Sequence, residues 1–149
     1  MATFQQQLKK ARNLNERKLS NDLFKFIKSI QAEIVKLNVD QINKDSKDIF
    51  GNPIGFYSYM TEVLTNGRKK QGEPFDGDDT GKWLKSFYLD MQGDMFRIYA
   101  TDPKTHLILD SDSWLSDDLF GLSDKNLKAL IKDRLTPFFI KNVRKILDV

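Results

Sequence analysis

The sequence predicts an α+β fold with a long N-terminal amphipathic helix, a small antiparallel β-meander and C-terminal helices. Apolar residues recur at helical spacing near both ends of the chain, and they alternate with a period of two between residues 87 and 100. The regions between are rich in glycine and in turn-forming residues. A chain of 149 residues has the usual size of one domain, so a single domain over residues 1–149 is expected.

Residues 3–37 are predicted to be helical, in two pieces separated near the weak helix formers Asn13 and Asn15. The second piece carries apolar residues at alternating steps of four and three, and Ser20 is a suitable N-cap for it. A narrow stripe of this kind is typical of a helix that packs against a sheet or a neighbouring subunit. It is a candidate assembly seam and consists of Leu23, Ile27, Ile30, Ile34 and Leu37.

The next segments are rich in turns. Residues 45–58 hold Asn52-Pro53 between two glycines, which predicts a tight reversal, and the residues after Tyr57 fit a short helix or a strand equally well. Residues 66–82 contain four of the eight glycines and almost no apolar residues, which predicts a flexible surface loop. A candidate charged contact loop within this segment is formed by Arg68, Lys69 and Lys70.

The alternation of apolar residues predicts a β-hairpin with its turn at Gln92-Gly93-Asp94. Asp102-Pro103 ends the second strand, and residues 106–109 are expected to form a third strand, which completes the meander.

The last third of the chain begins with an acidic loop over residues 110–122, in which Trp114 and Phe120 are expected to be buried. The remaining residues have helical periodicity, and Ser123 is placed to cap the start of the helix. Thr136-Pro137 interrupts the pattern, and because proline is favoured at the first helical position, a new helix is expected to begin there.

Charge is segregated along the chain, although the net charge is only +3. Residues 1–37 carry +5 and residues 119–149 carry +4, whereas residues 72–118 carry −7. Patches of opposite sign suit head-to-tail contact between copies of the chain. The alternative is that lysines solvate the helical ends and aspartates solvate the loops.

Several function classes receive no support from the composition. Cysteine is absent, so disulfides and thiolate metal sites are excluded. The N-terminal residues lack the apolar core of a secretory signal, and no apolar run reaches the ~20 residues that span a membrane. Neither secretion nor a membrane partner is therefore expected.

Two loops imitate known binding motifs but are incomplete. Residues 77–83 resemble a phosphate-binding loop, but Trp83 stands where a magnesium-binding hydroxyl residue is needed. Residues 76–81 match the first half of a calcium loop, but the last ligand position is Phe87. A lone histidine, His106, cannot by itself build a catalytic triad or a zinc site. The sequence thus predicts no catalytic residue, no cofactor and no metal site.

Two alternative functions remain open. A nucleic-acid-binding accessory protein could use the basic residues of the N-terminal region and of the 68–70 loop to contact phosphates. A metal-dependent nuclease could gather magnesium with the aspartates of residues 110–118, but helix capping and the solubility of the loop are the preferred explanation of these aspartates.

The residues Asp79, Thr80, Gly81, Leu84 and Ser86, within the segment from Asp79 to Phe87, resemble the Asp-Thr-Gly signature of tail-completion proteins of tailed bacteriophages, which are also called head–tail connector or minor tail proteins. The order of the expected elements is similar to that family as well, with a strand that begins directly after the signature. Residues 41–51, ahead of Tyr57, Ser58 and Thr61, are similar to the related virion-morphogenesis proteins. One departure is the segment 104–110, which stands where many members carry a Tyr-Ala and Glu-x-Gly stretch.

The resemblance implies a non-enzymatic structural protein of the virion, made in the bacterial cytoplasm and built into the neck or tail of the particle. Such a protein would form a homo-oligomeric ring that joins the head to the tail. Its partners would be other virion proteins, namely connector or portal-proximal proteins and tail proteins, with incidental contact with DNA.

Overall fold

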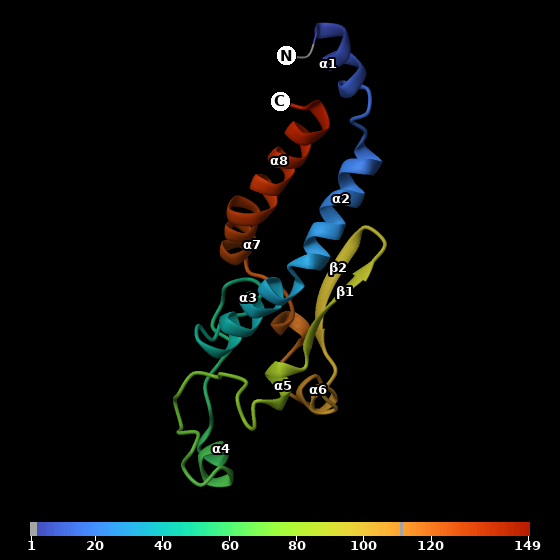
Figure 1. The fold of residues 1–149 in the computed structure, drawn as a ribbon. Helices are drawn as coiled ribbons and strands as arrows, with labels where there is room; N and C mark the ends of the chain where they lie inside the picture. The colour runs from blue at the N-terminus through green and yellow to red at the C-terminus, as the bar shows by residue number, and fades with distance from the viewer. Residues whose placement is uncertain (1–2, 111) are drawn as a thin grey trace. The chain divides into compact units, whose positions relative to one another are not determined.

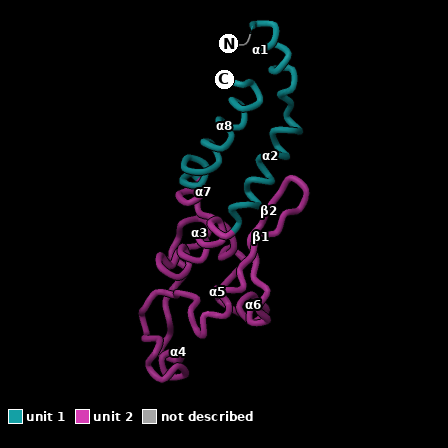
Figure 2. Tube along the Cα trace, viewed as in Figure 1, with its two compact units in different colours: residues 1–31, 128–149 teal, residues 32–127 magenta. Residues whose placement is uncertain are grey.

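The computed structural model describes residues 3–110 and 112–149 and confirms the α+β class, with helices and a two-stranded antiparallel sheet (Figure 1). The chain divides into two compact units (Figure 2). Unit 1 comprises residues 1–31 and 128–149, and unit 2 comprises residues 32–127. Units of this kind occur within single domains and in pairs of domains alike, so the prediction of one domain stays a prediction.

The N-terminal region contains three helices where two were predicted: α1 (Phe4–Ala11), α2 (Glu16–Ser29) and α3 (Gln31–Asn43). The prediction that Ser20 is an N-cap is wrong, because Asn15 already caps α2 by accepting a hydrogen bond of 2.8 Å from the Lys18 amide. Ile30 ends α2 with non-helical dihedral angles (φ −105°, ψ 18°). The apolar stripe therefore runs over two helices.

The stripe is covered most completely at its centre. Ile27, Ile30 and Ile34 are buried, and Leu23 and Leu37 at its ends are half-buried. These side chains contribute to the hydrophobic core of the chain itself. A role of the stripe as an assembly seam stays a prediction.

The C-terminal region is one helical rod of changing type: α7 (Asp124–Leu130), the π-helical turn η2 (Ile131–Leu135) and α8 (Thr136–Leu147). Ser123 caps α7 as predicted, because its hydroxyl accepts a hydrogen bond of 3.4 Å from the Asn126 amide. Pro137 lies in the first turn of α8, also as predicted. The expected interruption before it takes the form of the π turn, which keeps the rod continuous.

Unit 1 is held together by contacts between α2 and α8 and between α1 and the C-terminus. The rings of Phe26 and Phe138 stack at 4.1 Å between centroids, and the Asn142 side chain donates a hydrogen bond of 3.0 Å to Asp22. Lys10 forms an ion pair of 2.6 Å with Asp148. The unit therefore depends on residues from both ends of the chain.

Two buried amides of α3, Asn38 and Gln41, tie this helix to the rest of unit 2. The side chain of each residue both accepts and donates hydrogen bonds, so the backbone N–H and C=O groups of the loop beside the helix have hydrogen-bond partners. Asn38 bonds to the Leu119 carbonyl at 2.9 Å and to the Gly121 amide at 3.1 Å. The partners of Gln41 are Asp48 O, Gly121 O, Ser123 N and Asn126 Nδ2, at 2.8–3.3 Å.

The predicted reversal in residues 45–58 is confirmed. The Asp48 carboxylate accepts hydrogen bonds of 2.9 Å from the amides of Phe50 and Asn52, which closes the turn. The residues after it form a helix, α4 (Tyr59–Leu64), whose first turn is capped by the Ser58 hydroxyl. The choice between helix and strand, which the sequence left open, is thereby decided.

The predicted hairpin is confirmed as β1 (Phe87–Gln92) and β2 (Met95–Ala100), paired from Phe87 with Ala100 to Gln92 with Met95. Gly93 has a φ of 62° in the two-residue turn, a conformation that glycine adopts without strain. Leu89 and Ile98 are buried opposite each other. The hairpin thus presents one apolar face to the core.

The prediction of a third strand at residues 106–109 is wrong, because these residues belong to the helix α6 (Lys104–Ile108) or directly follow it. The Asp102 carboxylate accepts a hydrogen bond of 2.8 Å from the Lys104 amide, and Pro103 precedes the helix with helical dihedral angles. These start signals outweigh a short apolar alternation. Within the described residues the sheet is a hairpin and not a meander.

The acidic loop, of which residue 111 lies outside the described residues, contains the short 3₁₀ helix η1 (Asp117–Leu119). The expectation that Trp114 is buried is wrong, since it is 57% exposed and touches the Phe75 ring only edge-on, at 5.7 Å. Phe120 is half-buried against the Phe87 ring, at 5.2 Å. The buried side chain of the loop is Leu119.

Candidate functional site

The Asp79-Thr80-Gly81 turn begins the candidate site. Gly81 has a φ of 80°, and the Thr80 hydroxyl accepts a hydrogen bond of 3.4 Å from the Lys82 amide. The turn leads into a one-turn helix, α5 (Lys82–Lys85), so the prediction that a strand begins at once is wrong. Ser86 ends this helix, and its hydroxyl accepts a hydrogen bond of 3.1 Å from the Asp102 amide.

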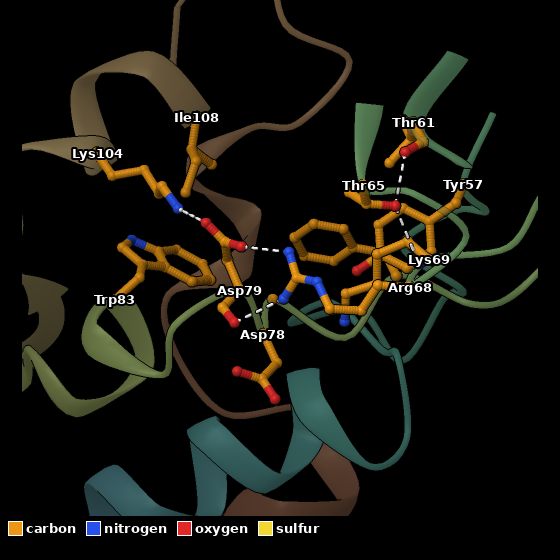
Figure 3. Close-up of a pocket in the computed structure, with 12 residues that line it drawn as sticks. Tyr57, Thr61, Thr65, Arg68, Lys69, Asp78, Asp79, Trp83, Lys104 and Ile108 are labelled. Atoms are coloured by element: carbon orange, nitrogen blue, oxygen red, sulfur yellow. Dashed lines mark hydrogen bonds and ion pairs between the residues drawn. The ribbon is translucent and has the colours of Figure 1, made fainter. Parts of the chain in front are cut away.

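Asp79 lies between two cations from different elements (Figure 3). One carboxylate oxygen pairs with the Lys104 ammonium at 2.6 Å, and the other pairs with the Arg68 guanidinium, which also donates to the Asp79 carbonyl at 2.7 Å. Hydrogen bonds from Lys104 and Arg68 lower the pKa of Asp79 to about 2. The carboxylate therefore fastens the 66–82 loop to α6.

A second carboxylate, Asp76, fastens the same loop from inside. Both of its oxygens lie 2.8 Å from the Lys69 ammonium, and one accepts a hydrogen bond of 2.6 Å from the Tyr57 hydroxyl. Burial opposes ionisation of Asp76, but the bonds from Lys69 and Tyr57 outweigh it and hold its pKa below the ordinary value. Burial, together with the bond to Asp76, raises the pKa of Tyr57.

These contacts surround a pocket with a volume of about 260 Å³ (Figure 3). Its apolar lining is supplied by Tyr57, Phe75, Trp83 and Ile108, and its charged lining includes Asp79 with its two cations. This volume lies just below the range of about 300–1,000 Å³ that is usual for ligand pockets. Trp83 is buried and donates a hydrogen bond of 3.2 Å to Thr105, which fixes the apolar wall.

The structure brings together part of the predicted set. Arg68 and Lys69 of the charged contact loop line the pocket with Asp79 of the signature, whereas Lys70 is exposed and lies outside it. The other signature residues, Thr80, Gly81, Leu84 and Ser86, shape the turn and α5 without lining the pocket. The loop makes specific ion pairs, and its flexibility stays a prediction.

Sequence reasoning missed Lys104 and Ile108 as members of the site. Both lie on α6, a segment that was predicted as the end of one strand and the start of another. The start signal Asp102-Pro103, read as the N-terminus of a helix, could have placed them on a helix. No local pattern could have paired Lys104 with Asp79, which is 25 positions earlier.

The ion pairs at the site join oppositely charged side chains. Asp76 pairs with Lys69, Asp79 pairs with Arg68 and Lys104, and the pocket lining contains no histidine. His106 is exposed on α6. In residues 3–110 and 112–149, no three side chains of histidine, aspartate or glutamate are arranged to hold a metal ion.

No family model, curated protein or solved structure matches this chain. Among the described residues, every helix is too short or too polar to cross a membrane.

Proposed function

We propose that this protein is a structural assembly component of a tailed-phage particle, located in the neck or at the tail-completion position. In this role it joins head to tail through ring-forming contacts with copies of itself and with other virion proteins. The resemblance of the Asp79–Phe87 segment supports the family. An exposed apolar surface supports the mode of action.

The apolar surface on α4 is the observation on which the proposal depends. Four of the six residues of this helix are large, apolar and more than half exposed: Tyr59, Met60, Val63 and Leu64. Their spacing places them on one side of the helix. Large exposed apolar patches are rare on monomeric proteins and mark interaction sites, and these four side chains are proposed to form such a patch.

Burial of this surface would contribute to association. Full burial of one large apolar side chain is worth about 1.5–3 kcal/mol, and the four side chains expose between 51% and 75% of their area, so together they offer on the order of 4–8 kcal/mol. This is of the same order as the entropic cost of association, so further contacts must add to it. The neighbouring pocket can accept a partner's apolar side chain between Tyr57, Phe75 and Trp83. The ion pairs of Asp79 with Arg68 and Lys104 hold the walls of this pocket in position in the absence of a partner.

The test compares two double variants by light scattering and sedimentation. Met60 and Leu64 are 63% and 75% exposed, and Met60→Ser with Leu64→Ser removes apolar area from α4. Met95 and Leu107 are 70% and 73% exposed elsewhere in unit 2, so Met95→Ser with Leu107→Ser is a matched control. Wild type and control are expected to form closed oligomers as concentration rises, whereas the α4 variant stays monomeric.

A monomeric wild-type protein at every concentration would refute the ring. Equal loss of assembly in both double variants would refute the role of α4, because the two variants lose similar exposed apolar side chains.

A further inference from the structure

The two units carry opposite net charges. Unit 1 holds thirteen basic and four acidic residues, a net charge of +9, whereas unit 2 holds eleven basic and seventeen acidic residues, a net charge of −6. In unit 2 many cations are neutralised by ion pairs, such as Lys69 with Asp76 and Lys104 with Asp79. Positive charge in unit 1 is mostly left exposed to solvent.

Part of the exposed charge of unit 1 lines a groove on η2 and α8. Four cations line this groove and are exposed: Lys132, Lys141, Arg144 and Lys145. We refer to these four residues as the cationic stripe. No acidic residue lines the groove, and among residues 3–110 and 112–149 no acidic side chain forms a salt bridge with a member of the stripe.

The π turn places Lys132 in the stripe. In an uninterrupted α-helix, the twelve positions from Lys132 to Arg144 would amount to about three and a third turns, which separates the two side chains by a third of a turn. A π turn absorbs about one extra residue. With η2 in place, about three whole turns separate Lys132 from Arg144, and both line the same groove.

The stripe matches the phosphate backbone of a nucleic acid in length and chemistry. From Lys132 to Lys145 it extends about 20 Å along the helix, at a rise of about 1.5 Å per residue. Duplex DNA presents successive phosphates of one strand about 3.4 Å apart along its axis, so the stripe spans about six base pairs. Ammonium and guanidinium groups are the donors that contact phosphates in such complexes.

The remaining residues of the groove favour a duplex over a single strand. They are Thr136, Pro137, Ile140 and Val149, none of them aromatic, so the groove offers no surface on which unpaired bases could stack. Asn142, an amide on the same helix, already donates to Asp22. B-form DNA admits an α-helix in its major groove, whereas the deep, narrow groove of duplex RNA does not.

We propose that the cationic stripe of unit 1 binds the phosphate backbone of duplex DNA without sequence preference. This binding goes beyond assembly, because it uses η2 and α8 and not the α4 surface. Four cations that neutralise four phosphates predict a slope of about −3.6 in a plot of log K against log salt concentration. Affinity should therefore fall about 150-fold between 50 and 200 mM salt.

Fluorescence anisotropy with a dye-labelled duplex and the full-length protein measures this slope. Replacement of all four stripe residues by glutamine removes four charges and keeps good helix formers at exposed positions. The control replaces four exposed lysines of unit 2 by glutamine, with the same loss of charge: Lys70, Lys82, Lys85 and Lys125. The stripe variant should lose at least 10-fold in affinity at 50 mM salt and most of the slope, whereas the control keeps the slope.

Three results would overturn the proposal: no binding by wild type at 50 mM salt, a slope near zero, or equal losses in the two variants. If the cationic stripe instead binds the acidic unit 2 of a second copy, the wild-type protein would self-associate and would not bind DNA. The stripe variant would then lose this self-association. Circular dichroism of each variant establishes that it is folded, so a loss of binding cannot be attributed to unfolding.

Discussion

Gln41 offers a quantitative test of how unit 2 is held together. Its side chain is 1% exposed and forms four hydrogen bonds, two through the amide nitrogen and two through the oxygen. The variant Gln41→Met keeps the length of the side chain and removes all four bonds. The variant therefore differs from wild type in the hydrogen bonds of this side chain and not in its length.

The expected cost follows from the burial of the partners that are left behind. The bond from the Ser123 amide is buried, and an unsatisfied buried amide costs about 2 kcal/mol. The other three partners are only part-buried and can turn to water, so together they add about 1 kcal/mol. The free energy of unfolding of Gln41→Met should thus be about 3 kcal/mol lower than that of wild type.

Urea unfolding, followed by the fluorescence of the buried Trp83, measures this difference, and the m-value should not change. Gln31→Met is the matched control, because Gln31 is exposed on the same helix and should cost less than about 0.5 kcal/mol. A loss below about 1 kcal/mol for Gln41→Met, or equal losses for both variants, would show that the hydrogen bonds do not hold α3 in place.

Two further predictions concern the candidate site. Gly77→Ala should lower the free energy of unfolding by about 2 kcal/mol, since φ is +68° and the added Cβ would lie 2.8 Å from the Trp83 ring. Gly67→Ala, with φ +79° and open space, isolates the backbone contribution, and thermal unfolding that affects both variants equally would contradict the clash. Asp79→Asn should lower Tm by about 2 °C at pH 7, a small effect because its ion pairs are half exposed. The pKa of Asp79 is lowered in the folded protein from its ordinary value of 3.8 to about 2. The stabilisation by its ion pairs is therefore complete above pH 3.8 and is lost as the pH falls through about 2, where the difference in Tm between wild type and Asp79→Asn should disappear. A difference in Tm that persists at that pH would contradict the ion pairs as its source.

The sequence predicted elements whose signals are local. Helical spacing located the terminal helices, and the alternation of apolar residues located the hairpin, although Gln92 of the predicted turn Gln92-Gly93-Asp94 belongs to β1. The errors fall where two local signals compete. At residues 106–109 a short alternation competed with the helix start at Asp102-Pro103, and near Ser20 a good cap competed with Asn15, which lies closer to the true start.

Most of the candidate site could not be predicted, because its contacts join residues far apart in sequence. Asp79 meets Arg68 and Lys104 at separations of 11 and 25 positions. Trp114 was expected to be buried, yet 57% of it is exposed beside Gly55, where a Cβ would lie 2.2 Å from its ring. A preference for burial states how often a residue type is buried and cannot place an individual side chain.

The composition of unit 1 has a consequence for biosynthesis. Its first 31 residues leave the ribosome early, but the helix that covers Phe26 is translated only after residue 127. Unit 2 is continuous in sequence and contains all of its own residues once Leu127 has been added, whereas the apolar face of α2 waits for Phe138. A ribosome-bound chain that ends at residue 127, followed by a linker long enough to clear the exit tunnel, should therefore carry a unit 2 that resists protease and an N-terminal segment that is readily cleaved.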